Sequence, residues 1–219
     1  MYKTAAYDMD GVLLRSNGLK SAAFHSAALP YGEPAAAAMV ALHRAAGSIS
    51  RRERVERFFL AVLGREPKQR EVDAMVQEIG AQLTDAYRAV PYLAEIKSRI
   101  EMQAADGVKV VVVTGVEESE ARRILEARSV CVLLDGIYGG PPVKRERLRQ
   151  LIEQGAIEPP AVYFGDTLDD YEAAHANGLD FVLVTPDAEW DWRPWLATDP
   201  AGVVAVIEEL PLPRWAVPA

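Results

Sequence analysis

Residues 4–12, Thr-Ala-Ala-Tyr-Asp-Met-Asp-Gly-Val, join an apolar run to two carboxylates and a glycine. The run, 4–7, is typical of a buried strand, and Asp8 and Asp10 come directly after it. Side chains two residues apart in an extended chain point to the same side, so both carboxylates face one region. Gly11 then allows the backbone to turn away. Two carboxylates this close favour a cation or a proton beside them, although an Asp-x-Asp alone is also common in turns and caps.

Further short apolar runs alternate with segments of helical spacing along the chain. Two of these runs, 108–113 and 161–164, end as the first does, in a small or acidic residue. The expected helices cover 117–128, 143–154, 168–177 and 203–210, and a further expected strand covers 180–184. This alternation predicts an α/β fold with a doubly wound parallel sheet, a Rossmann-like core whose ligands bind at the carboxyl ends of the strands.

The segment 16–89 has a different character. It contains no strand-like run, it is rich in alanine, and its apolar residues recur at helical spacing. We interpret it as an all-helical insertion after the first strand. The chain is therefore expected to divide into an α/β core, residues 1–15 and 90–219, and a helical unit, residues 16–89.

Composition narrows the class of protein. The 219 residues carry 24 Lys and Arg against 32 Asp and Glu, a formal net charge of −8, and 50% of them are hydrophobic. This balance is that of a folded globular chain, and the acidic surplus argues against nucleic-acid binding. No apolar stretch is long enough to span a membrane, no targeting signal is visible, and the single Cys131 cannot form an internal disulfide. We therefore expect a cytoplasmic protein with no membrane partner.

A second acidic cluster occupies residues 165–170, Gly-Asp-Thr-Leu-Asp-Asp, where the third apolar run ends and a helix opens. Asp166 and Asp170 are four residues apart, so they face one side of the first helical turn. Helix capping explains single members of the cluster, but it does not explain a second acidic group at another strand end of the same sheet. Together Asp8, Asp10 and Asp166 resemble an all-oxygen site for Mg²⁺.

Two further elements would suit a phosphate group. Thr114 and Gly115 end the valine-rich run and precede a helix, so a hydroxyl and backbone N–H groups can hold a phosphate oxygen. Lys144 opens another expected helix after residues 139–142, Gly-Gly-Pro-Pro, which read as a turn. A lysine there would neutralise a phosphate and an attacking carboxylate together, although a surface position is the default for any single lysine.

These motifs, in this order, resemble those of the haloacid dehalogenase-like hydrolase superfamily. The matching segments are 8–12, 113–115, Lys144 and 165–170, and the resemblance spans nearly the whole chain. The helical insertion is similar to the cap of the superfamily's first cap class. The resemblance implies a Mg²⁺-dependent phosphatase, monomeric or homodimeric, that acts on a small phosphorylated metabolite such as a sugar phosphate.

The resemblance also implies roles for individual residues. Asp8 would attack phosphorus to give an aspartyl-phosphate intermediate, and Asp10 would act first as an acid and then as a base. Mg²⁺ would be held by Asp8, by the backbone carbonyl of Asp10 and by Asp166. Phosphate oxygens would be bound and their charge stabilised by Thr114, Gly115 and Lys144. Asp170 would orient metal-bound water or the Lys144 ammonium.

Substrate contacts are also expected in the helical insertion. The stretch 43–51 resembles one seen in phosphatases of surface-polysaccharide or sugar-phosphate metabolism, which makes Arg44 and Arg51 candidate contacts. Ser50 followed by Glu53 also forms the pattern of a capping box, and this is the simpler explanation of that part of the stretch.

Two features stay outside this scheme. Arg15 stands where many relatives carry an acidic residue; it would contact substrate or alter the hinge, and we favour the structural interpretation. Trp190, Trp192 and Trp195 fall within six residues, and they would cover the sheet edge or form a dimer surface.

Two other activities fit parts of the same pattern. A sugar phosphomutase on the same fold would return the phosphate to a sugar instead of passing it to water. A receiver-type binding module would accept phosphate on an aspartate without turnover, but the helical insertion counts against it because such modules lack a cap.

Overall fold

The computed structural model describes residues 1–45, 47, 49–93 and 96–208. The chain forms two compact units. One unit combines Met1–Arg15 with the described residues from Pro91 onward, and the other is Ser16–Val90. Each unit has its own set of buried apolar residues.

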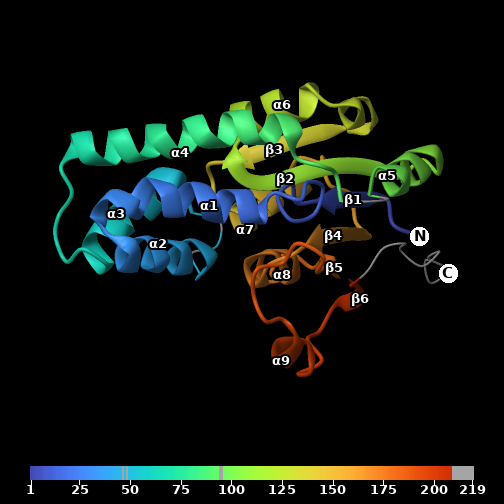
Figure 1. Cartoon of the computed structure of the whole chain (residues 1–219). Helices are drawn as coiled ribbons and strands as arrows, with labels where there is room; N and C mark the ends of the chain where they lie inside the picture. The colour runs from blue at the N-terminus through green and yellow to red at the C-terminus, as the bar shows by residue number, and fades with distance from the viewer. Residues whose placement is uncertain (46, 48, 94–95, 209–219) are drawn as a thin grey trace. The chain divides into compact units, whose positions relative to one another are not determined.

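A parallel sheet of six strands forms the centre of the first unit, in the order β3-β2-β1-β4-β5-β6 (Figure 1). The strands are β1 (Thr4–Tyr7), β2 (Lys109–Glu117), β3 (Gly136–Gly140), β4 (Ala161–Gly165), β5 (Asp180–Val184) and β6 (Val203–Ile207). Every residue of β1 and β4 is buried, because helices cover both faces of a parallel sheet and its inner strands must be apolar throughout. The predicted doubly wound α/β sheet is confirmed.

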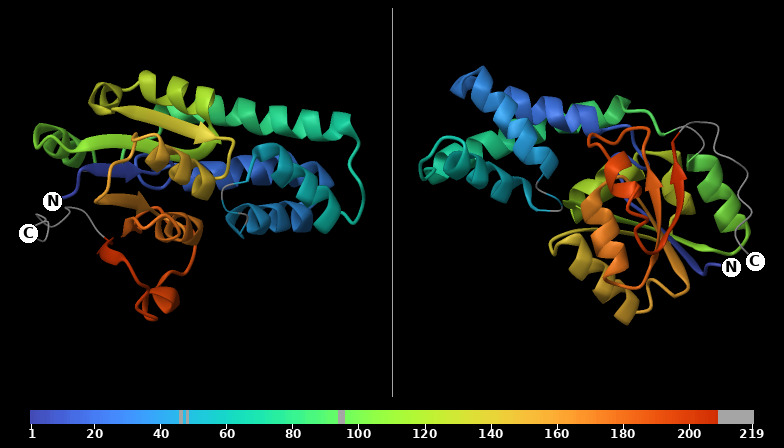
Figure 2. Two further views of the ribbon diagram at one scale, coloured as in Figure 1. Left: turned by 180° about the vertical axis from the view of Figure 1, so that it is seen from behind. Right: turned by 90° about the horizontal axis from the view of Figure 1, so that it is seen from below.

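Helices cover the two faces of this sheet (Figures 1 and 2). Crossovers between parallel strands are right-handed, so the helix lies on one face when the chain moves one way along the sheet and on the other face when it moves back. The helices before and after β2 therefore share one face, and the next two helices share the other. The first pair is α5 (Ile96–Ala105) and α6 (Glu118–Glu126), and the second pair, packed side by side, is α7 (Lys144–Glu153) and α8 (Leu168–His175). The short elements η2 (Ser129–Leu133) and α9 (Arg193–Leu196) complete the described part of this unit. A large apolar cluster lies between the sheet and the second pair.

Two elements differ from the sequence-based expectation. The helix expected at 203–210 is wrong, because residues 203–207 form strand β6, while 209 and 210 lie outside the described residues. Val-Val-Ala-Val-Ile is rich in β-branched side chains, whose stiffness favours a strand, and β6 pairs with β5. Strand β3 was not expected, since three of its five residues are glycine, and the first half of the expected 139–142 turn belongs to it.

The second unit is all-helical in its described residues. It contains α1 (Asn17–Ala28), η1 (Leu29–Tyr31), α2 (Glu33–Ala45), α3 (Arg51–Ala61) and α4 (Gln69–Ala89). Helix α1 packs on α2 and α4. The fully buried side chains of this unit include Phe24, Met39, Phe58 and Ile79. Even α4, with 21 residues, is amphipathic, and no helix among the described residues is long and apolar enough to cross a membrane.

The chain leaves the first unit and returns to it at adjacent points. Leu14 and Tyr92 form an antiparallel bridge, and the N–H of Arg15 donates to the carbonyl of Pro91 over 3.0 Å. The exposed Arg15 side chain follows the buried residues 11–14. The two connecting segments are therefore hydrogen-bonded to each other, which holds both ends of the inserted unit Ser16–Val90 together.

Candidate active site

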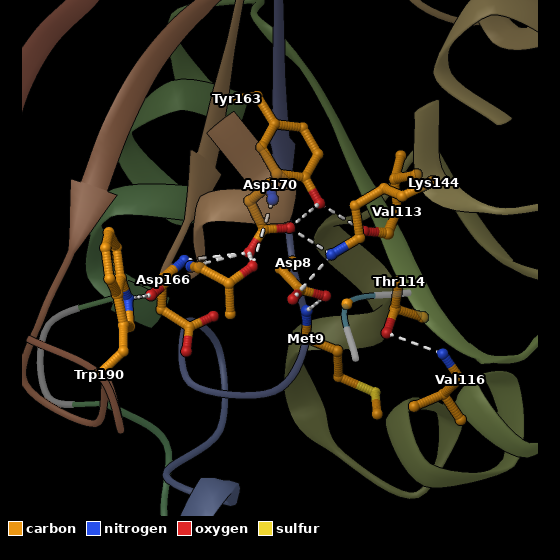
Figure 3. Close-up of polar contacts among 12 residues, drawn as sticks. Asp8, Met9, Val113, Thr114, Val116, Lys144, Tyr163, Asp166, Asp170 and Trp190 are labelled. Carbon is orange, nitrogen blue, oxygen red and sulfur yellow. Dashed lines mark hydrogen bonds and ion pairs between the residues drawn. The ribbon is translucent and has the colours of Figure 1, made fainter. Parts of the chain in front are cut away.

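Buried polar side chains gather where β1 and β4 end, in the second half of β2, and where α7 and α8 begin (Figure 3). Asp8, Thr114, Lys144, Asp166 and Asp170 are between 0% and 7% exposed. Charged groups are seldom buried unless they are paired, so this concentration marks the region as functional. The ends of parallel strands supply most of these residues, which is why positions far apart in the sequence meet here.

Asp8 is held by contacts to both of its carboxylate oxygens. Its backbone N–H donates to the carbonyl of Phe164 over 2.9 Å, which continues the pairing of β1 with β4. Oδ1 accepts the N–H of Met9 at 2.7 Å, and Oδ2 lies 3.0 Å from the Lys144 ammonium. Burial raises the pKa of Asp8 to about 6; the Lys144 charge opposes this increase, whereas the carboxylates of Asp170 and Asp10 add to it. The carboxylate is thus aimed and partly neutralised without being exposed.

Beyond Asp8 the chain forms a tight turn that buries Asp10. The N–H groups of Leu13 and Leu14 both donate to the carbonyl of Met9, at 3.0 and 2.9 Å, and the Gly11 N–H donates to Leu14. Gly11 has φ of +76°, a left-handed conformation that favours glycine. Asp10 is only 4% exposed, so the turn keeps it beside the end of β1.

Lys144 is the first residue of α7, and its side chain reaches back to the end of the sheet. Its ammonium makes ion pairs with Asp8 and, at short range, with Asp170. It also lies 5.7 Å from the centre of the Tyr163 ring, whose face attracts a cation. Burial works to lower the pKa of Lys144, but the charges of Asp170 and Asp8 outweigh it and hold the pKa well above the usual value. The lysine is therefore a permanent cation inside the fold.

Asp170 is fully occupied by donors within the protein. Its Oδ2 accepts the N–H of Asp166 at 3.2 Å, the N–H of Thr167 at 3.1 Å and the Thr167 hydroxyl at 2.6 Å, while Oδ1 contacts Lys144. Thr167 caps α8 in return by accepting the Asp170 N–H. Gly165 is required beside it, because a Cβ there would overlap the Asp170 side chain. Asp170 therefore orients Lys144 and the start of α8.

Oxygen atoms of Asp8, Asp166 and Asp170 all lie within 4.8 Å of one another. Buried carboxylate oxygens are the donors that Mg²⁺ prefers, so this cluster fits the predicted metal. Asp170 already accepts several hydrogen bonds and forms an ion pair. Asp8 and Asp166 are therefore better suited than Asp170 as ligands of the metal. Asp10 was expected to contribute its backbone carbonyl, which does not require its side chain to join the cluster.

Thr114 and Gly115 lie inside β2, which continues to Glu117 with a shift of register after Val113. Thr114 is buried and its hydroxyl accepts the N–H of Val116 at 3.2 Å, whereas Gly115 is exposed. Thr114 and Gly115 were expected to end this strand, and β2 instead continues two residues beyond Gly115, with the register shift separating both residues from the regular pairing. Their contact with phosphate stays a prediction.

Sequence reasoning missed two residues that support this region, Tyr163 and Arg147. Tyr163 donates its hydroxyl to the carbonyl of Val113 at 2.7 Å, and Arg147 donates to the carbonyls of Gly139 and Pro141 at 2.7 and 2.6 Å. Gly139, part of the expected turn, also supports the region, because a Cβ there would lie 2.5 Å from the carbonyl oxygen of Val116 in β2 and from backbone atoms of Glu118. A hydroxyl inside the apolar run 161–164 was the available signal for Tyr163; nothing local distinguishes Arg147.

Ser50 and Arg51 have structural partners in the helical unit. Ser50 accepts the N–H of Glu53 at 3.1 Å and caps α3, as the capping interpretation predicts. The guanidinium of Arg51 lies against Gly80 of α4, and Arg44 is exposed near the end of α2. A role for Arg44 or Arg51 in binding substrate stays a prediction.

The three tryptophans pack on the core of the first unit. Trp192 is 7% exposed, and Trp190 and Trp195 are half-buried against the same apolar cluster. They were expected to cover the sheet edge or to form a dimer surface; they pack on the cluster against one face of the sheet, and a dimer surface stays a prediction.

Residues 5–175 match the family model described as haloacid dehalogenase-like hydrolase. No curated protein matches the sequence. Among solved structures, a predicted phosphoglycolate phosphatase from Haemophilus somnus 129PT is similar, with 19% identity and a TM-score of 0.68 over 91% of this chain and 98% of that one.

Two other structures are similar over most of both chains. A haloacid dehalogenase-like family protein from Streptococcus pneumoniae has 17% identity and a TM-score of 0.71, covering 95% of this chain and 94% of that one. CbbY from Rhodobacter sphaeroides, in complex with phosphate, has 18% identity and a TM-score of 0.71 with 94% of each chain covered. At these identities the likeness establishes a shared fold.

Proposed function

The chain belongs to the haloacid dehalogenase-like hydrolase family, and we propose that it is a Mg²⁺-dependent phosphatase of a small phosphomonoester. One observation carries the proposal. A buried carboxylate, Asp8, stands at the end of the central strand with a buried cation, Lys144, 3.0 Å from one oxygen and the Asp166 carboxylate close by. Such an arrangement serves to bring a second anion, the phosphate, to a nucleophilic oxygen.

Asp8 acts as the nucleophile in this proposal. One of its oxygens forms a bond to phosphorus as the bond from phosphorus to the ester oxygen breaks, which leaves an aspartyl-phosphate and an alcohol. The N–H of Met9 and the Lys144 ammonium fix the carboxylate before substrate arrives, so little reorientation is needed. The phosphatase names of similar structures support this class of substrate.

Asp10 acts as the general acid and then as the general base in this proposal. It gives a proton to the departing ester oxygen, and in the second step takes one from the water that attacks phosphorus. That attack breaks the bond between phosphorus and the Asp8 oxygen, which releases inorganic phosphate and restores the carboxylate. The turn closed by Gly11 keeps Asp10 two residues from the nucleophile and nearly free of solvent.

The remaining groups bind the phosphate or the metal and compensate the negative charge of the phosphate. Lys144 stays protonated because of its two carboxylate neighbours, so it can offset phosphate charge throughout the reaction. Thr114 and Gly115 would donate a hydroxyl and an N–H to the other phosphate oxygens. Asp8 and Asp166, with the Asp10 carbonyl, would hold Mg²⁺, which when bound neutralises phosphate oxygens and lowers the repulsion that the nucleophile meets. In this proposal the first unit is the catalytic core and the helical unit is a cap that selects the substrate.

The test is release of inorganic phosphate from a panel of phosphomonoesters at pH 6 to 8, with and without Mg²⁺. We expect release from at least one ester, strong loss with EDTA, and restoration by Mg²⁺. Asp8→Asn removes the charged nucleophile while it keeps the size of the side chain, and it should abolish release. A panel in which no ester is hydrolysed would contradict the proposal.

Two further measurements separate the alternatives. Interconversion of sugar phosphate isomers that depends on a sugar bisphosphate would indicate a phosphomutase. Stable labelling of Asp8 by a small phosphodonor, without turnover, would indicate a receiver-type module. Sugar phosphates are the first esters to test, because CbbY, a structure similar to this one, is also described in complex with xylulose-1,5-bisphosphate.

A further inference from the structure

Trp190 lies in the segment between β5 and α9, and its indole N–H donates to the backbone carbonyl of Asp166 over 2.7 Å (Figure 3). We propose that Trp190 is a positioning residue that fixes Asp166 for metal binding. This inference rests on the proposed function, in which Asp166 is a ligand of Mg²⁺. It assigns a role to a residue that no sequence motif of the site includes.

Side chains hold the Asp166 backbone at both of its polar groups. Its N–H donates to Asp170 Oδ2 at 3.2 Å, and its carbonyl accepts the Trp190 indole. Asp166 precedes the N-cap of α8, and the first backbone bond of that helix runs from Tyr171 to the carbonyl of Thr167. The helix therefore does not use the Asp166 carbonyl, and the indole supplies its hydrogen bond.

The Trp190 ring is itself held by a string of aromatic contacts. Its centre lies 5.6 Å from that of Trp195, and the Trp195 ring meets the edge or face of Tyr171 at 4.9 Å. Tyr171 belongs to α8, the helix that begins beside Asp166, and it also contacts Phe181 of β5. A ring anchored in this way can hold a peptide group in one orientation, because its own movement is restricted on several sides.

Packing explains an aromatic ring at this position but not its N–H. If the indole only filled space, a phenyl ring would serve as well. A hydrogen bond to the carbonyl of Asp166 additionally limits rotation of the peptide group, and so limits the directions in which the Asp166 carboxylate points. Groups that orient a ligand from outside the coordination sphere typically change metal affinity by about 10- to 100-fold when removed.

The first experiment compares two matched variants by calorimetric titration of the whole protein with Mg²⁺. Trp190→Phe keeps a ring and removes the N–H, whereas Trp192→Phe makes the same change in a buried tryptophan of the same apolar cluster that is not part of the string. We expect Trp190→Phe to raise the Mg²⁺ dissociation constant about tenfold and Trp192→Phe to leave it within about twofold. Equal affinity in Trp190→Phe and the wild type would overturn the inference, as would equal weakening in both variants.

The phosphate-release assay of the same proteins keeps this inference separate from the proposed function. At saturating Mg²⁺, Trp190→Phe should approach the kcat of the wild type, since its defect lies in metal affinity. Normal binding and hydrolysis by the wild type with an unaffected Trp190→Phe would reject only the role of Trp190. A wild type that binds no Mg²⁺ would reject both.

A second measurement does not depend on whether Trp190→Phe folds. The indole ¹H–¹⁵N signals of the wild type can be assigned by replacing the other three tryptophans one at a time. We expect the Trp190 signal to move on addition of Mg²⁺ and to saturate at the dissociation constant found by calorimetry. A Trp190 signal that Mg²⁺ leaves in place would overturn the inference.

Discussion

Replacing Lys144 by methionine removes the only charge compensation that Asp8 and Asp170 share within the described contacts. Lys144→Met keeps most of the apolar stem but leaves two carboxylates at a place where the side chains are 10% and 0% exposed. Removing one partner from a buried ion pair costs about 3–5 kcal/mol. Asp170 keeps its three donors on Oδ2, so we expect a loss of about 3 kcal/mol in the free energy of unfolding at pH 8, near the lower end of that range.

The loss should depend on pH, with a definite sign. Without the ammonium, which now opposes the effect of burial, the pKa of Asp8 rises further above its present value of about 6. A carboxyl group with a raised pKa in the folded state contributes stability at low pH, below its unfolded-state pKa of about 3.9, and loses it as the pH rises through the folded-state value. The variant should therefore lie closer to the wild type at pH 5 than at pH 8.

The assay is urea denaturation of both proteins at the two pH values, with EDTA present so that no metal takes the place of the lysine. Lys109→Met is the control, since Lys109 forms an ion pair with Glu158 at 3.4 Å in which both side chains are well exposed. That pair should contribute at most about 1 kcal/mol. A loss below about 1 kcal/mol in Lys144→Met at pH 8, or an equal loss at both pH values, would refute this reasoning.

Three smaller changes test other parts of the structure by urea denaturation. Gly139→Ala should cost about 1–3 kcal/mol, because its Cβ would lie 2.5 Å from backbone atoms, whereas Gly18→Ala, with open space around it, should cost nothing; equal effects would contradict this. Tyr163→Phe should cost about 1–3 kcal/mol because the buried carbonyl of Val113 loses its donor, and a change near zero would count against that bond. Burial, aided by neighbouring cations, lowers the pKa of His43 to about 2, so its contribution to stability is present above the unfolded-state pKa of about 6.5 and is lost as the pH falls. The wild type should thus weaken more than His43→Gln between pH 7 and pH 5, and parallel curves would disprove it.

The strands that could be predicted from the sequence are those whose own residues demand burial. Strands β1, β4 and β5 are apolar almost throughout, and such short runs have few other stable positions in a soluble protein. Strand β3 consists mainly of glycine, and its conformation is imposed by pairing with β2, which no local pattern reports. Strand β6 was mistaken for a helix because periodicity alone does not distinguish a strand from a helix in so short an apolar run. Its β-branched residues favoured a strand.

The candidate site divides in a similar way. Asp8, Asp166 and Lys144 could be placed at one edge of the sheet because each follows a strand or opens a helix, and that position is encoded locally. Tyr163 and Trp190 meet the site through contacts between elements, at separations of 50 and 24 residues, and their local sequence resembles ordinary core. A single sequence therefore predicts the site residues that belong to a motif. It does not predict those that join the site only through tertiary packing.

The paired connection at Leu14 and Tyr92 bears on how such a protein can diversify. Since the chain departs and returns at hydrogen-bonded neighbours, the sheet imposes nothing on the length or fold of what lies between them. The entropy of closing a loop grows only slowly with its length, so a short turn and a segment as long as Ser16–Val90 can join the same two ends at similar cost. The junction can thus accept inserted segments of different length without a change in the pairing of the sheet.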